Sequence, residues 1–152
     1  MNWIFYRNFD DFAAVHLYEV LKLRQEVFVI EQDCIYRDLD DYDQNASHLL
    51  LMNDDRLIGY LRILPPGLKF EEVSIGRIVT PLDLRGTGTG KQLISKGLDI
   101  VFEDGAENVR IEAQHHLENY YRKFGFRTVS EPYDMDGIPH IEMVMQRDER
   151  KL

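Results

Sequence analysis

The sequence predicts an α/β (α+β) domain in which a mixed sheet is covered by about three or four helices. Short apolar runs typical of strands recur along the chain, and longer segments carry apolar residues at helical spacing. Turn residues separate these segments, and no repeat, low-complexity stretch or linker-like composition divides them. Because a chain of 152 residues can bury one sizeable core, we expect a single domain over residues 1–152.

The first half predicts a strand, a long helix and a β-hairpin. Apolar residues recur at helical spacing in the helix, and Pro65-Pro66-Gly67 ends the hairpin. A polar, acidic segment lies between them, and we expect a solvated loop there. In order, the expected elements are a strand at 3–7, the helix at about 11–30, the loop at 33–45, and strands at 48–52 and 57–64.

The second half predicts further strands and helices and then a closing hairpin. Pro81 ends a strand, an amphipathic helix follows a glycine-rich turn, and Gly125 suits the C-terminal cap of a short helix. The expected elements are a strand at 73–80, the turn at 85–90, a helix with its apolar face from Leu93 to Phe102, a strand at 109–113, a helix at 117–124, and paired strands at 128–130 and 141–145 around a turn-rich segment at 134–139.

Composition and charge narrow the class of protein. The net charge of −9 argues against nucleic-acid binding, which depends on Lys and Arg facing phosphates. No basic leader precedes the first residues, and no apolar run approaches the roughly 20 residues of a membrane span. A single cysteine, Cys34, excludes an internal disulfide and a cysteine metal cluster. We expect a cytoplasmic protein with no membrane partner and no metal.

The most informative segment is the run Arg85-Gly86-Thr87-Gly88-Thr89-Gly90-Lys91, between a predicted strand and a predicted helix. Closely spaced glycines let the backbone approach a ligand, and the start of a helix offers unpaired N–H groups to an anion. The run is neither a Walker A loop, because Gln92 follows Lys91, nor a dinucleotide fingerprint, because its glycines are spaced G-x-G-x-G. It predicts a pyrophosphate site, and the alternative is a tight connection shaped by glycine alone.

Several segments resemble the GNAT acetyltransferases. Arg85-x-x-Gly88-x-Gly90, preceded by Ile78-Val79-Thr80-Pro81, resembles their coenzyme A signature. Tyr121-Arg122-Lys123-Phe124-Gly125-Phe126 resembles a second segment of that family. Residues 24–34 are similar to the ElaA-type branch of the family, so the resemblance runs nearly end to end. Further segments similar to this branch are 75–79, 116–121 and 136–140.

The resemblance implies a fold and a donor site. The fold is a mostly antiparallel central sheet of about six to seven strands, flanked by about three to four helices and splayed at its middle strands. The donor is acetyl-coenzyme A, whose pantetheine pairs with the strand at 78–80 and whose pyrophosphate lies against the glycine-rich turn. The coenzyme-binding residues implied are Ile78, Val79, Thr80, Arg85, Gly86, Thr87, Gly88, Thr89, Gly90, Lys91, Gln114 and Asn119; Gln114 stands where many members have an asparagine.

The resemblance also implies direct transfer of the acetyl group to a primary amine of a small molecule or peptide. Tyr121 matches the family's tyrosine and is the predicted proton donor to the departing thiolate, since a phenol with a pKa near 10 is a useful proton source. The alternative is that Tyr121 is a core tyrosine packed beside Phe124 and Phe126.

Direct transfer also needs a group that takes a proton from the amine. The candidates are Glu31 and His115, with His140 in reserve. Each has a structural alternative: Glu31 as a solvated or Arg24-paired carboxylate, and either histidine as a hydrogen-bonding residue of the fold.

Other polar residues carry weaker signals. Arg24 is expected to form a structural ion pair, and the alternative is that it binds a carboxylate of the substrate. Arg77 lies mid-strand and could point into the acceptor cleft, but strand alternation does not decide which face it takes. Cys34 has no evident partner base and is expected to be inert. The loop lacks the glycine and distal glutamate of a calcium loop, so a solvated loop is expected. Its aspartates are Asp38, Asp40, Asp41 and Asp43.

Two rival functions stay open at this stage. One is an acyl-homoserine-lactone-synthase-like acyltransferase, which shares Arg24-x-x-Val27-Phe28 before an acidic segment and would use acyl-carrier protein with S-adenosylmethionine. The other is a non-catalytic module that senses acetyl-coenzyme A. The resemblance is also compatible with a homodimer.

Overall fold

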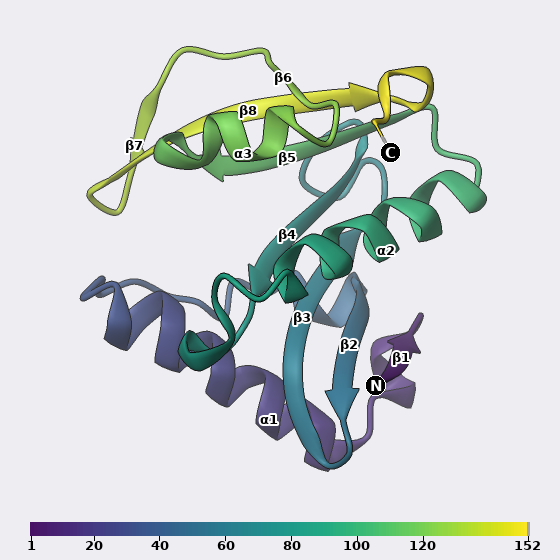
Figure 1. Ribbon diagram of the computed structural model, residues 1–152, viewed down its shortest axis with the longest axis vertical. Helices are drawn as coiled ribbons and strands as arrows, with labels where there is room; N and C mark the ends of the chain where they lie inside the picture. Colours follow the sequence, from purple (N-terminus) through teal and green to yellow (C-terminus); the bar gives the residue numbers. More distant parts are fainter. Residues whose placement is uncertain (152) are drawn as a thin grey trace.

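The computed structural model describes residues 1–151 as eight strands and three α-helices (Figure 1). The strands are β1 (Asn2–Tyr6), β2 (Ser47–Asn53), β3 (Arg56–Leu64), β4 (Val73–Val79), β5 (Asn108–Gln114), β6 (Arg127–Thr128), β7 (Tyr133–Met135) and β8 (Ile138–Gln146). The helices are α1 (Ala14–Arg24), α2 (Thr89–Glu103) and α3 (Glu118–Arg122). Within the described residues the sheet order is β1-β2-β3-β4-β5-β8-β6, with β7 on β8, and the parallel pair is β4–β5. The expected mixed, mostly antiparallel sheet is thereby confirmed.

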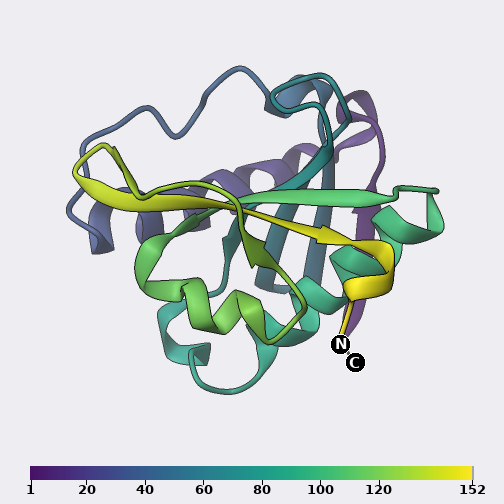
Figure 2. The same cartoon turned by 90° about the horizontal axis from the view of Figure 1, so that it is seen from above.

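Helices cover both faces of this sheet. α1 lies on one face, and α2 and α3 lie on the other (Figure 2). Successive residues of β2 point to opposite faces, so Leu49 joins the core under α2 and α3, whereas Leu50 joins the core under α1. Both residues are fully buried. Strands that are apolar on both faces, such as β2 and β3, need a cover on each side, and the helices provide it.

The predicted helix over 11–30 is confirmed with two differences. Phe9–Asp11 forms a separate 3-10 turn before α1, and Gln25–Glu31 continues α1 as a π-helical segment. π-helical turns are rare and occur frequently at functional sites. Glu31, one of the predicted candidate bases, is the last residue of this π-helical segment.

The expectation of a solvated acidic loop is wrong for three of its four aspartates. Arg24 is 1% exposed, and its guanidinium lies 2.8 Å from the Asp38 carboxylate and 2.8 Å from the Asp43 carboxylate. Arg62 on β3 lies 2.5 Å from Asp40 and 3.0 Å from Asp43. A buried guanidinium requires anionic partners, so the loop folds back onto the sheet. The expected ion pairing of Arg24 is confirmed.

The closing strands differ from the prediction. The segment expected to be a turn-rich connection forms β7 and the start of β8, joined by Asp136-Gly137 with φ values of 52° and 85°. Positive φ at both positions is the geometry of a two-residue type I′ hairpin. The sheet therefore has eight strands in the described chain rather than about six to seven. The predicted helix at 117–124 shortens to α3, preceded by the 3-10 turn His115–Leu117.

The end of α3 is packed against the last residues of the described chain. Gly125 has a φ of 117°, which confirms the expected left-handed cap. A Cβ at this position would clash with the carbonyl oxygen of Glu149. The backbone N–H of Lys151 donates to the carbonyl of Phe124 at 2.8 Å. These contacts hold α3, and with it Tyr121, against the sheet.

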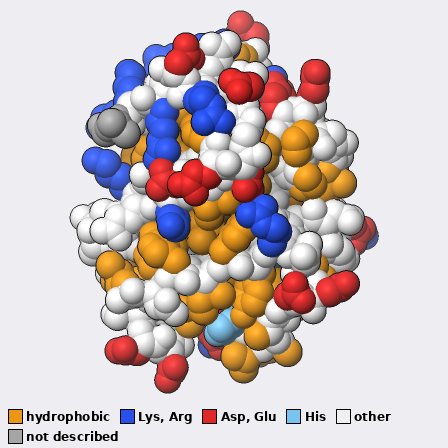
Figure 3. Space-filling model, turned by 90° about the vertical axis from the view of Figure 1, so that its right-hand side faces the viewer, with side chains coloured by type: hydrophobic (Ala, Val, Ile, Leu, Met, Phe, Trp, Pro, Cys, Tyr) orange, Lys and Arg blue, Asp and Glu red, His pale blue; other side chains and the backbone are white. Residues whose placement is uncertain are grey.

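Charged side chains surround the apolar ones on the surface. Figure 3 shows one face on which apolar side chains lie beside Lys and Arg. Two aromatic rings of β1 are each covered by a cation, with the Arg7 guanidinium 5.1 Å from the Phe5 ring and the Lys96 Nζ 6.0 Å from the Trp3 ring. Among residues 1–151, no helix has the length and apolar character that crossing a membrane requires.

Candidate active site

The parallel pair β4–β5 is joined only at its beginning. Val73 pairs with Val109 and Ser74 with Arg110, and beyond these residues the two strands separate (Figure 1). The predicted splay of the middle strands is confirmed. A pocket of about 440 Å³ lies in the gap, with β4 on one side and β5 on the other. Neighbouring residues of β5 that point to opposite faces both line it, so the pocket extends through the sheet.

A bulge in β4 changes the backbone beside this pocket. The β3–β4 register shifts between Tyr60 and Arg62, and Arg77 takes a φ of 48°, which non-glycine residues rarely adopt. The guanidinium of Arg77 is held by the carbonyl of Asp38 at 3.0 Å and the carboxylate of Asp40 at 3.2 Å. Arg77 thus lines the pocket with its charge paired to the acidic loop. The β4 residues predicted to pair with the coenzyme also line the pocket: Ile78, Val79 and Thr80.

The glycine-rich turn forms the N-terminus of α2. Gly88 is the N-cap residue with a φ of 87°, and Gly86 has a φ of 79°. A Cβ at either position would meet no atom of the described chain within 4 Å apart from its chain neighbours, so the turn faces open space. The 15-residue α2 directs unpaired N–H groups and the positive end of its dipole there. Arg85 lines the pocket, and the run from Gly86 to Lys91 continues beside it with its residues exposed or half-buried.

Tyr121 reaches the pocket from α3. Its side chain is 8% exposed and packs against Phe124 and Phe126, with ring centroids 6.5 Å and 6.1 Å away. Burial raises the pKa of the Tyr121 hydroxyl well above the ordinary value of a tyrosine. Tyr121 is therefore a core residue and also a pocket residue that stays protonated at neutral pH, and its raised pKa makes the hydroxyl a weaker acid than the pKa near 10 assumed from the sequence.

The candidate bases lie in different surroundings. Glu31 lines the pocket, and its carboxylate accepts a hydrogen bond from the Arg85 guanidinium at 2.5 Å. Among the described residues, the pocket lining includes His116 and His140 but not the predicted His115, which is exposed at the start of its 3-10 turn. Sequence alone gave no reason to prefer either of two adjacent histidines, and the turn places them differently.

Gln114 and Asn119, the other predicted coenzyme contacts, are placed apart. Gln114 lines the pocket at the end of β5, with its Nε2 3.4 Å from the Oε1 of Gln32. Asn119 is exposed on α3 and is not part of the pocket lining within the described chain.

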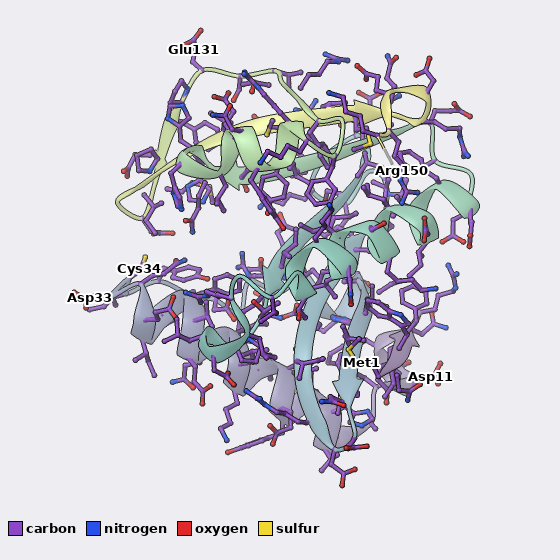
Figure 4. All side chains as sticks on the ribbon, in the orientation of Figure 1. Met1, Asp11, Asp33, Cys34, Glu131 and Arg150 are labelled. Atoms are coloured by element: carbon purple, nitrogen blue, oxygen red, sulfur yellow. The ribbon has the colours of Figure 1, made fainter. Side chains whose placement is uncertain are left out.

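Cys34 is buried, and its Sγ lies 3.4 Å from the carbonyl oxygen of Asp136, pointing toward the β7–β8 hairpin (Figure 4). This contact joins the acidic loop to the hairpin across the pocket.

Sequence reasoning missed an acidic group on the β5 wall. Glu112 lines the pocket, and its carboxylate accepts hydrogen bonds from Tyr133 at 2.6 Å and Lys69 at 3.0 Å. Burial alone would raise the pKa of Glu112, but these two bonds and the charges of Lys69 and His140 lower it below the ordinary value. Strand alternation could have indicated Glu112, because it shares a face with Gln114. Tyr133 and Lys69 lie in distant segments and carried no such signal.

Comparisons with known proteins match residues 12–147 to the family described as Acetyltransferase (GNAT) domain. A UPF0039 protein of Synechocystis is 38% identical over 148 residues, which cover 96% of each chain. Protein ElaA of Escherichia coli is 41% identical over 140 residues, which cover 90% of this chain and 92% of ElaA. The crystal structure of an acyl-CoA N-acyltransferase from Pseudomonas aeruginosa has a TM-score of 0.89 at 38% identity and covers 95% of this chain and 98% of that one. The chain belongs to the GNAT acetyltransferase family, with ElaA among its relatives.

Proposed function

We propose that this chain transfers an acetyl group from acetyl-coenzyme A to a primary amine by direct attack in a ternary complex. The observation that supports this proposal is the pocket between β4 and β5. It joins Arg85, at the glycine-rich turn, to Tyr121 and to the β5 wall of Glu112 and Gln114. We propose that residues 1–152 form a single catalytic domain; Leu152 lies outside the described residues.

The residues present fit a long, anionic coenzyme. Gly86 and Gly88 leave the backbone at the N-terminus of α2 open, and Arg85 and Lys91 add positive charge for phosphates. Beyond the bulge, the residues 78–80 offer backbone donors and acceptors to the pantetheine amides. The coenzyme supplies the acetyl group as an activated thioester.

The protein's own contribution is position and proton transfer. Holding an amine beside the thioester carbon converts a bimolecular reaction into an effectively unimolecular one. Tyr121, which is protonated and lines the pocket, supplies a proton to the thiolate that leaves. The net reaction turns an ammonium and an acetyl thioester into an amide, a thiol and one released proton.

The first experiment is a calorimetric titration of the purified protein with acetyl-coenzyme A, with desulfo-coenzyme A and ATP as comparisons. We expect binding with a Kd on the order of micromolar for the coenzyme, and none for ATP. Gly88→Glu should abolish binding. Gly105→Glu is the matched control, because Gly105 also has positive φ and open surroundings but lies past the other end of α2.

The outcomes separate the rival functions. Failure of every coenzyme A species to bind would refute the donor site. Binding without turnover of any amine would favour the non-catalytic sensing module. Activity restricted to acyl-carrier protein with S-adenosylmethionine would favour the lactone-synthase-like acyltransferase.

A further inference from the structure

The proposed transfer needs a group that removes a proton from the acceptor's ammonium, and the contacts in the pocket narrow the choice. The Glu31 carboxylate is engaged by the arginine of the glycine-rich turn at 2.5 Å. The Glu112 carboxylate has one oxygen bonded to Tyr133 and the other to Lys69. Both oxygens of Glu112 are therefore occupied by donors, whereas Glu31 lies beside the arginine proposed to bind the phosphates. The remaining pocket residues are therefore the candidates for the base.

His140 has a different environment. Its Nδ1 lies 2.8 Å from the carbonyl oxygen of Ile138. A carbonyl oxygen only accepts, so Nδ1 carries the proton of the neutral ring and Nε2 keeps a free lone pair. The tight Asp136-Gly137 turn and the fixed φ of Pro139 hold the backbone that presents this ring.

The strand register places His140 on the sheet face away from Tyr121, the predicted acid. His140 is paired with Gln114 across β5–β8, so both point to the sheet face that Glu112 also occupies. Tyr121 packs in the core of the other face, together with Ala113. His140 and Tyr121 nevertheless line the same pocket, because it extends through the gap between β4 and β5. The pocket lining therefore includes a histidine from one face of the sheet and a tyrosine from the other.

We propose that Nε2 of His140 takes the proton from the acceptor's ammonium, with the Glu112 carboxylate nearby favouring the imidazolium that results; this assignment rests on the proposed function. The N–H bond breaks, its electron pair stays on nitrogen, and the proton bonds to Nε2. The amine then forms the C–N bond, and the C–S bond breaks with its electron pair on sulfur. The thiolate takes the proton of Tyr121, which regains one from the new amide nitrogen through water. His140 returns its proton to solvent.

The first test determines the tautomer in the ¹⁵N-labelled full chain without ligand. Long-range ¹H–¹⁵N spectra at about pH 8, where histidines are ordinarily neutral, should show a proton on Nδ1 of His140 and none on Nε2. His140→Gln assigns the signal by its loss. A proton on Nε2 would overturn the proposal, because that nitrogen could not accept another. This result requires no acceptor.

The second test measures thiol release from acetyl-coenzyme A with spermidine, tyramine, glucosamine and a tripeptide as probe amines. His140→Ala should lower kcat with the best of these by about 100-fold or more, and free imidazole should restore part of the rate. The calorimetric Kd of the His140→Ala variant for acetyl-coenzyme A should match that of the wild type. His16→Ala is the matched control, because His16 lies on α1 and is bonded to Tyr6 instead of lining the pocket.

An unchanged kcat in His140→Ala, or a loss that imidazole does not restore, would overturn the assignment. An equal loss in His116→Ala that imidazole restores would transfer the role to the other pocket histidine and overturn it as well. Absence of acetyl-coenzyme A binding in the wild type would refute the proposed function itself. If none of the probe amines is acetylated, the tautomer measured in the first test decides whether His140 can act as the base.

Discussion

The ion pair between Glu31 and Arg85 leads to the prediction that removing a carboxylate strengthens coenzyme binding. Glu31 Oε2 lies 2.5 Å from Arg85 Nη1. Arg85 is one of the two cations of the proposed phosphate site, so a phosphate and Glu31 compete for its guanidinium. Glu31→Gln keeps the size of the side chain and removes the competing charge.

The size of the effect follows from the exposure of the pair. The Arg85 and Glu31 side chains are 42% and 29% exposed, so solvent screens their attraction. Pairs of this kind contribute about 0.2–1 kcal/mol. Releasing Arg85 should therefore lower the Kd of acetyl-coenzyme A by about 1.4- to 5-fold in a calorimetric titration. The gain should shrink as salt is added, because screening weakens the pair that is removed.

Asp83→Asn is the control for a general effect of charge. Asp83 lies near the same turn and pairs with Arg56 at 2.6 Å. Each variant removes one negative charge, so a long-range effect on an anionic ligand would appear in both. Weaker binding in Glu31→Gln, or an equal gain in Asp83→Asn, would refute the competition.

Three further predictions concern the turn, the acid and the acidic loop. Gly88→Ala should weaken acetyl-coenzyme A binding in calorimetry, because its left-handed φ costs other residues about 1–2 kcal/mol; unchanged affinity would contradict this. Tyr121→Phe should lower kcat in the thiol-release assay at unchanged Kd, whereas parallel losses would indicate a packing role alone. Burial alone would raise the pKa of Asp40, but its bond to Arg62 and the charges of Arg62 and Arg77 lower it to about 2. Because the folded pKa is depressed, Asp40 contributes about 2 kcal/mol to the free energy of unfolding above about pH 4, and this contribution is lost as the pH falls toward 2. Urea unfolding at a series of pH values should show the loss. The loss should be smaller in Asp40→Asn.

Local patterns were sufficient for most of the fold. β2 and β3 were predicted to within a few residues because they are short apolar runs bounded by turn residues, and α2 because its apolar residues recur at helical spacing. β7 was not predicted, because Tyr133–Met135 is short and becomes a strand only by pairing with β8. The π-helical segment after α1 was missed for another reason. An apolar pattern that indicates a helix does not show whether the helix is α-helical or π-helical.

The site was predictable where it depends on contiguous residues and not where it depends on distant partners. The glycine-rich turn and Tyr121 lie in short segments, and the structure brings both to one region. The ion pairs of Arg24 with Asp38 and of Arg62 with Asp40 join residues 14 and 22 positions apart, and composition gives only the number of charges. The expectation of a solvated loop was wrong because burying each arginine depends on the tertiary fold.

The packing at Gly125 affects how substitutions in the segment 121–126 of this chain should be interpreted. Gly125 belongs to the segment 121–126 that resembles the GNAT family, yet the structure gives it two steric roles. Its φ is 117°, and the Glu149 carbonyl approaches it closely. A side chain there would push the last residues away from α3 and would impair activity without touching a substrate. Loss of function at this position would therefore report on the anchoring of the chain's end, whereas Tyr121, one helical turn earlier, is the residue of this segment whose variants report on the proposed chemistry.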